Sequence, residues 1–130
     1  MRKEEILRKL KEFPYPEEEY WLITGAAMVL YGMREETHDI DLGCSRDMAD
    51  QLEKDGWLYK RTENGKRSFR IGETFEIFEE WKTGTLQWEE GVQLLSPEGL
   101  IAMKSALGRE KDLRDIALIR DWLSAKAKEG

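Results

Sequence analysis

The sequence predicts a single α+β domain over residues 1–130, with α/β as the neighbouring class. Apolar residues recur at helical spacing in some segments and at alternate positions in others. Their order is helix, strand–helix–strand, helix, hairpin, strand and two helices, which predicts a mixed or antiparallel sheet flanked by helices, with a helical C-terminus. A chain of 130 residues holds one core and has little left for a second, and no repeat or linker divides it.

The first elements follow from spacing and punctuation. Residues 3–13 predict a helix that ends at Pro14, because proline lacks the N–H donor and restricts the residue before it. The stretch "YWLIT" at 20–24 predicts a short buried strand, and residues 25–33, which start at a glycine, predict a short helix packed on it. "HDIDLGC" at 38–44 returns to alternation and predicts a second strand.

The middle of the chain predicts a helix and a hairpin. Ser45 is a candidate N-cap for a helix that Gly56 closes. Asn64-Gly65 stands between two alternating segments, which is a strong hairpin signal. Residues 73–81 predict a further strand, and residues 82–95 predict a loop with one short strand near Val92 to Leu95.

Two helices complete the prediction. The first starts at Ser96 as N-cap with Pro97 at the first helical position, and it ends at Gly108. In the second, a helical stripe of apolar side chains is expected to face the core. The stripe consists of Leu113, Ile116, Ile119 and Leu123.

Composition restricts the classes of function. Acidic residues outnumber basic ones 27 to 21, which argues against broad binding to nucleic acid or to an anionic membrane. No apolar run approaches the roughly 20 residues that cross a bilayer. The N-terminus is too charged for a signal peptide, and Cys44 is the only cysteine, so we expect a cytoplasmic protein without disulfides.

Two aspartates in the second predicted strand are the first candidate site. Alternate residues of a strand face the same side, so Asp39 and Asp41 point together at a spacing of about 7 Å, while Ile40 and Leu42 face the core. Two parallel carboxylates repel each other, and a cation between them relieves the repulsion. Oxygen ligands favour Mg²⁺ or Mn²⁺ over zinc. A solvated acidic strand face is the alternative interpretation.

A glycine upstream supplies a second candidate site. Gly25 ends the first predicted strand and begins a helix. The free N–H groups and positive dipole of a helix start bind phosphate, and the small side chains of Gly25 and Ala26 let phosphate approach the backbone. A phosphate site beside a carboxylate pair suits a nucleoside triphosphate with its metal ion.

The same residues carry a family resemblance. "TGAAMVLYGMREETHDIDL" resembles the signature of the DNA-polymerase-β-like nucleotidyltransferases, in which Gly and Gly or Ser precede Asp-hydrophobic-Asp-hydrophobic by about a dozen residues. Here Gly25-Ala26 is followed by twelve residues and then by Asp39-Ile40-Asp41-Leu42. The pattern of Arg34 and then Thr37-x-Asp39-x-Asp41 looks most like small bacterial members of the superfamily, including those of abortive-infection and toxin–antitoxin systems, although Arg34 stands one residue further from Thr37 than is usual. The later block "LLSPEGLIAMKSALGREKDLRDI" resembles the same group.

The resemblance implies a nucleotidyltransferase fold and a reaction. Such enzymes move a nucleoside monophosphate from an NTP such as ATP to a hydroxyl and release pyrophosphate, with Mg²⁺ or Mn²⁺ held by three acidic residues. Asp39 and Asp41 match two of them, and Glu76 is the best candidate for the third, ahead of Glu73, Glu79 and Glu80. The expected phosphate-binding residues are Gly25, Ala26, Thr37, Lys104 and Arg109.

The acceptor and the activity itself stay open. RNA, a protein or a small molecule could accept the nucleotide, and a toxin–antitoxin partner protein is possible. The main alternative function is a nucleotidyltransferase fold that binds without turnover, as an antitoxin-like or regulatory module. Ala26 in place of serine, the choice of third carboxylate and the short chain favour that alternative.

Overall fold

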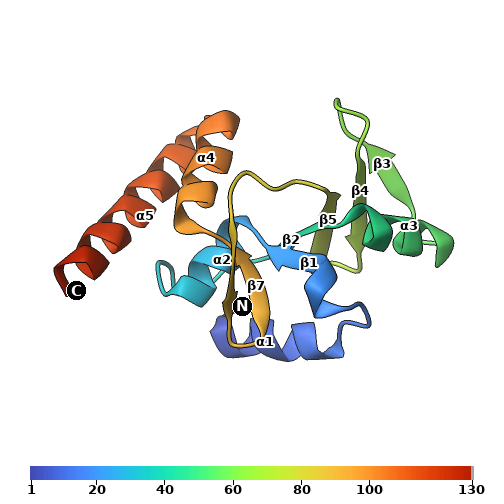
Figure 1. The fold of residues 1–130 in the computed structure, drawn as a ribbon, viewed down its shortest axis with the longest axis horizontal. Helices are drawn as coiled ribbons and strands as arrows, with labels where there is room; N and C mark the ends of the chain where they lie inside the picture. Colours follow the sequence, from blue (N-terminus) through green and yellow to red (C-terminus); the bar gives the residue numbers. More distant parts are fainter. Residues whose placement is uncertain (130) are drawn as a thin grey trace.

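A computed structural model describes residues 1–129 of the chain (Figure 1). The helices are α1 (Lys3–Glu12), α2 (Thr24–Tyr31), α3 (Arg46–Lys54), α4 (Pro97–Leu107) and α5 (Glu110–Glu129), with a short 3-10 turn at Glu17–Glu19. The strands are β1 (Tyr20–Leu22), β2 (Ile40–Cys44), β3 (Tyr59–Arg61), β4 (Arg67–Ile71), β5 (Phe75–Glu79), β6 (Leu86–Glu89) and β7 (Val92–Leu95). Within these residues no helix is both long and apolar enough to span a membrane.

The strands form one mixed sheet in the order β3-β4-β5-β2-β1-β7-β6. β2 runs parallel to β5, and β1 runs parallel to β7, whereas the remaining neighbours are antiparallel. At the C-terminal end, α4 and α5 pack side by side as a helical pair (Figure 1). The predicted α+β class, with a mixed sheet flanked by helices and a helical C-terminus, is confirmed.

Local signals account for most element ends. The Ser45 and Ser96 hydroxyls accept hydrogen bonds from the backbone N–H groups of Met48 and Gly99, as expected of N-caps. Gly108 closes α4 with a φ of 63°, in the left-handed region that glycine adopts without strain. The predicted Asn64-Gly65 turn joins β3 to β4.

The inward side chains of β2 and β5 belong to the hydrophobic core on one face of these two strands. Ile40, Leu42 and Ile77 are fully buried there, together with Cys44. Residues of α1, α2 and α3 belong to the same cluster, and the Phe13 ring after α1 stacks on Phe75 of β5 with centroids 4.7 Å apart. β2 and β5 are therefore covered on this face, and the residues that alternate with these side chains project from the other face.

Two predictions of local structure are wrong. Residues 86–89, expected in a loop, form β6, which joins β7 through Glu90 and Gly91, both with positive φ as in a tight hairpin. Because β6 is an edge strand with largely exposed side chains, it lacks the apolar alternation of a buried strand. In α5 the predicted stripe is buried at Ile116 and Ile119 but not at Leu113, which is 59 % exposed. The other buried positions of this helix belong to Asp112 and Asp115.

Candidate active site

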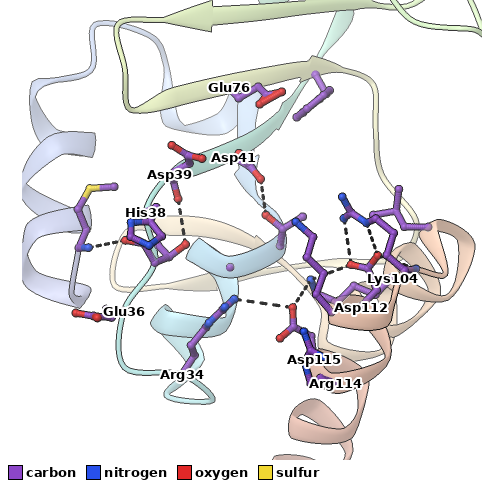
Figure 2. A pocket seen from close by; sticks show the side chains of 18 of the residues that line it. Arg34, Glu36, His38, Asp39, Asp41, Glu76, Lys104, Asp112, Arg114 and Asp115 are labelled. Atoms are coloured by element: carbon purple, nitrogen blue, oxygen red, sulfur yellow. Dashed lines mark hydrogen bonds and ion pairs between the residues drawn. The ribbon is translucent and has the colours of Figure 1, made fainter.

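A cleft of about 950 Å³ separates the polar face of the central strands from the α4–α5 corner (Figure 2). Carboxylates from the sheet line one side, and cations from α4, α5 and the loop after α2 line the other. The acidic lining residues include Asp39, Asp41 and Glu76, and the basic ones are Arg34, Lys104, Arg109, Lys111 and Arg114. The cleft thus offers both a place for a cation and a place for an anion.

The register of two parallel strands brings Glu76 beside Asp41. Asp41 of β2 is paired directly with Glu76 of β5, so both side chains project from the same face. Asp39 stands one residue before β2 and lies next to Asp41 in the cleft (Figure 2). Ile40 and Leu42, which alternate with these aspartates, are buried in the core, as the alternation predicted.

The other glutamates near β5 are engaged elsewhere. Glu79 lies on the core face, where the Arg67 guanidinium donates to both of its oxygens at 2.9 Å. Glu80 pairs with Lys66 Nζ at 2.7 Å, and Glu73 is exposed before the strand. Among the glutamates weighed from the sequence, Glu76 is the one whose side chain lines the cleft.

Burial and mutual repulsion disfavour the charged form of two of these carboxylates and so raise their pKa values. Burial chiefly raises the pKa of Asp41, with the charge of Asp39 acting in the same direction, whereas a hydrogen bond from the Thr24 hydroxyl at 2.7 Å lowers it. The pKa of Glu76 is also raised, first by burial and then by the charge of Asp41. A nearby cation stabilises the charged form of such carboxylates.

Arg70 places a cation beside two of these carboxylates. It is paired with Glu76 across β4 and β5, and its guanidinium lies 3.4 Å from the Glu76 carboxylate and 3.7 Å from that of Asp39. All three side chains are partly exposed, so these contacts are weak and can open. The carboxylates of Asp39, Asp41 and Glu76 form the acidic wall of the cleft. Arg70 is placed to compete with any other cation that binds there.

The donor set fits a hard divalent cation. Asp39, Asp41 and Glu76 offer only carboxylate oxygens, which Mg²⁺ and Mn²⁺ accept. Within residues 1–129, no three acidic, histidine or cysteine side chains converge on a single metal position. Magnesium nevertheless binds through one or two carboxylates and completes its shell with water and phosphate oxygens. The arrangement suits a cation that is shared with a phosphate-bearing ligand.

The start of α2 also opens into this cleft. Thr24 and Gly25 line it, whereas Ala26 has no exposed surface and belongs to the core. At Gly25 a Cβ atom would lie 2.6 Å from the Thr37 hydroxyl oxygen and 3.2 Å from Arg34 Nη1, so the loop after α2 packs closely on this residue. A residue with a Cβ atom would clash with this loop, which accounts for glycine at position 25 and places Thr37 beside the start of α2.

Lys104 and Arg109 lie in the cleft wall but are already paired with acids. Lys104 is buried, and its Nζ lies 2.9 Å from Asp115 and 3.8 Å from Asp112. Arg109 contacts the fully buried Asp112 with Nε at 2.6 Å, which lowers the pKa of that carboxyl. Asp115 also lies 3.9 Å from Arg34, so two acids organise three cations here.

Sequence reasoning missed three residues of the site: Thr24, Arg70 and Asp115. Thr24 directly precedes Gly25, but no local pattern indicates that its hydroxyl faces Asp41. Arg70 does not line the cleft but reaches Glu76 and Asp39 through the antiparallel pairing of β4 with β5, which the segment around Gly72 could have suggested. The ion pairs of Asp115 depend on how α4 packs on α5 and have no signal in spacing alone.

An aromatic pair continues the wall beyond Glu76. Phe78 and Trp81 both line the cleft, and their ring centroids lie 5.1 Å apart in an edge-to-face arrangement. The Trp21 indole donates to the Trp81 backbone oxygen at 2.9 Å and holds that segment against β1. These rings form a flat apolar surface next to the acidic residues.

Comparison with solved structures identifies the fold. A candidate nucleotidyltransferase from Thermotoga maritima superimposes with a TM-score of 0.62 and 17 % sequence identity over 96 % of each chain. ANT(2″)-Ia in complex with adenylyl-2″-tobramycin matches 95 % of this chain and 88 % of its own, with a TM-score of 0.58 and 20 % identity. No family model and no curated protein sequence matches the chain. On this structural likeness, the chain has the fold of nucleotidyltransferases.

Proposed function

We propose that this protein is a metal-dependent nucleotidyltransferase that moves a nucleoside monophosphate from an NTP to a hydroxyl and releases pyrophosphate. The observation that carries the proposal is the strand register that sets Asp41 beside Glu76, in the cleft that the first residues of α2 also line. A cationic wall faces these carboxylates across the same cleft. The fold that the chain shares with nucleotidyltransferases supports this assignment.

The acidic wall holds the metal in this proposal. Asp39, Asp41 and Glu76 would hold Mg²⁺ or Mn²⁺, and the ion would compete with the partly exposed Arg70 guanidinium for Asp39 and Glu76. When bound, the ion would offset the charge of the triphosphate and favour ionisation of the attacking hydroxyl. The raised pKa values of Asp41 and Glu76 support a site that is completed by a cation.

The triphosphate lies between the start of α2 and the α4–α5 corner. The backbone of Gly25 faces the phosphates, and the buried Ala26 supports the helix from inside. Arg34, Lys104 and Arg109 supply positive charge, oriented by Asp112 and Asp115. Phe78 and Trp81 offer a stacking surface for a base or for an acceptor ring.

The chemistry is a displacement at phosphorus. The acceptor oxygen attacks the α-phosphorus, the bond from that phosphorus to the oxygen bridging the β-phosphate breaks, and pyrophosphate leaves. The hydroxyl proton passes to a cleft carboxylate. Glu76 lines the cleft beside Asp41 and is placed to accept this proton.

Calorimetric titration with Mg²⁺ and each NTP tests the binding half of the proposal. The wild type should bind, and Asp39→Ala and Asp41→Ala should each lose most of the heat. Asp121→Ala, an exposed acid on α5 that does not line the cleft, is the matched control and should bind as the wild type does. Equal heats from all four proteins, or none from the wild type, would contradict the proposal.

A binding module without turnover is the second candidate. The observation that favours it is that Lys104 is already paired with Asp115, and Arg109 with Asp112. These acids partly neutralise the two cations and so weaken their attraction for phosphate. Incubation with α-labelled NTPs separates the two candidates. The acceptor arms are total RNA, total cell protein and a polyhydroxylated amine such as tobramycin, the adduct that ANT(2″)-Ia holds.

The pattern of label then decides. An enzyme leaves label on one acceptor class, and the label disappears with Asp41→Asn. Binding of Mg-NTP by calorimetry without label in any arm supports the binding module.

A further inference from the structure

Thr24 adopts a backbone conformation that a threonine rarely takes. It is the first residue of α2, and its φ is 50°. A β-branched side chain is strained in this left-handed region, whereas glycine adopts it freely. Such strain persists only when the surrounding structure enforces it, and it concentrates at functional sites. The side chain at this position must therefore supply something that glycine lacks.

The contact that Thr24 makes is a hydrogen bond to the central carboxylate of the cleft. Its hydroxyl donates to Asp41 Oδ2 at 2.7 Å, so this interaction joins α2 to β2. The hydroxyl does not cap the helix, because α2 has no side-chain cap among its hydrogen bonds. Helix capping, the usual reason for a threonine at a helix start, is thus excluded.

We propose that Thr24 is a positioning residue that fixes the rotamer of the Asp41 carboxylate for the cation, and that the chain keeps it there against backbone strain. The inference rests on the proposed function, since it assigns Asp41 to the metal. Asp41 stands beside two other carboxylates, those of Asp39 and Glu76, whose charges repel its own. The hydrogen bond holds one oxygen and leaves the other available.

Mn²⁺ alone is the probe for this role, because its binding is measured without turnover. Thr24→Val preserves the shape of the side chain and the strain but removes the hydroxyl, and we expect about a tenfold weaker Mn²⁺ affinity from the loss of a charge-assisted hydrogen bond. Thr24→Ser keeps the hydroxyl and should stay within about twofold of the wild type. Thr85→Val, on an exposed threonine outside the cleft, is the control and should bind as the wild type does.

The strain is tested by stability of the metal-free protein. Thr24→Ala and Thr24→Gly both lack the hydroxyl, so only the backbone preference separates them. Glycine should raise Tm by roughly 3–6 °C over alanine, because it relieves the positive φ. At Ala102, exposed within α4, the same exchange of alanine for glycine should lower Tm by about 2–5 °C. Both Thr24 variants should bind Mn²⁺ as weakly as Thr24→Val does.

The outcomes separate this inference from the function on which it rests. Wild-type affinity in Thr24→Val, with Asp41→Ala inactive in binding, overturns the role of Thr24 and leaves the proposed function standing. No Mn²⁺ binding by the wild type overturns both. If Thr24→Gly is no more stable than Thr24→Ala, the residue is not held against strain and the inference is wrong. A sign reversal between positions 24 and 102, together with weak binding by all variants without the hydroxyl, supports it.

Discussion

At the scale of single residues, the cleft depends on close packing at one glycine and on ion pairs at one arginine. Gly25 is packed under the loop after α2, and Arg70 sits between two carboxylates that would otherwise repel each other. Both residues contact side chains that the proposed function uses. Each therefore yields a prediction that a single substitution tests.

Replacement of Gly25 by alanine should push the Thr37 loop away from the start of α2. The new Cβ would lie 2.6 Å from Thr37 Oγ1, well inside van der Waals contact. We expect a loss of about 1–3 kcal/mol in the free energy of unfolding by urea, together with weaker Mg-NTP binding. The double variant with Thr37→Ala removes the clashing oxygen and should recover part of the stability. Full stability in Gly25→Ala alone would contradict this packing.

Removal of the Arg70 charge should strengthen metal binding. The guanidinium lies within 3.4–3.7 Å of Glu76 and Asp39 and competes for the same oxygens. For partly exposed ion pairs we expect Arg70→Gln to raise Mn²⁺ affinity by about two- to fivefold, with a smaller gain at high salt. Arg61→Gln, on exposed β3 and outside the cleft, is the control. Unchanged binding by Arg70→Gln would contradict this competition, and weaker binding would show that Arg70 assists the site.

At the scale of elements, one buried ion pair ties the sheet to α3. Arg67 of β4 donates to Glu79 of β5 and also reaches Glu53 and Asp50 on α3, at 2.7–2.9 Å. Arg67 and Glu79 are both less than a tenth exposed. Because this network fixes β5 against β4 and α3, it also fixes the strand that carries Glu76.

Acid should weaken this tie in a defined pH range. The hydrogen bonds from Arg67 lower the pKa of Glu79 from 4.5 to about 2. A lowered folded pKa means that the stabilisation is complete above about pH 4.5 and is lost as pH falls towards about 2. It amounts to about 3 kcal/mol at most.

Urea unfolding at several pH values measures this contribution. Glu79→Gln should flatten the acid limb of the stability profile, whereas Asp50→Asn, whose carboxylate is 60 % exposed, should change it little. An unchanged acid limb in Glu79→Gln would contradict the assignment.

At the scale of the whole molecule, the acidic wall should couple metal binding to pH and to global stability. The folded-state pKa values of Asp41 and Glu76 are raised, so the metal-free protein loses stability from these groups as pH rises through them. A bound cation removes that penalty. A fixed concentration of Mn²⁺ should therefore raise Tm more at pH 7 than at pH 5. At a hundredfold excess over Kd, the total stabilisation by the ion is about 2.7 kcal/mol.

The control for this measurement is the variant Asp41→Asn, which should show little Mn²⁺-dependent stabilisation at either pH. Its metal-free form should be at least as stable as the wild type at pH 7, because the substitution removes one of the repelling charges. A stabilisation by Mn²⁺ that is equal at both pH values would argue against binding at these carboxylates.

The sequence by itself determined features that depend on neighbours along the chain. The N-caps at Ser45 and Ser96, the Asn64-Gly65 turn and the inward direction of Ile40 and Leu42 follow from local geometry. The shared face of Asp39 and Asp41 follows from the same alternation. The resemblance to nucleotidyltransferases then predicted the fold that the structural comparisons bear out.

Only the tertiary structure decided which distant residues meet. The parallel register of β2 and β5 selects Glu76 to face Asp41, and the packing of α4 on α5 pairs Lys104 with Asp115. Burial removes Ala26 from the cleft, and the positive φ of Thr24 aims its hydroxyl at Asp41. The physical reason is that strand register and helix packing are set by the summed contacts of the whole core, so no short stretch of sequence encodes them.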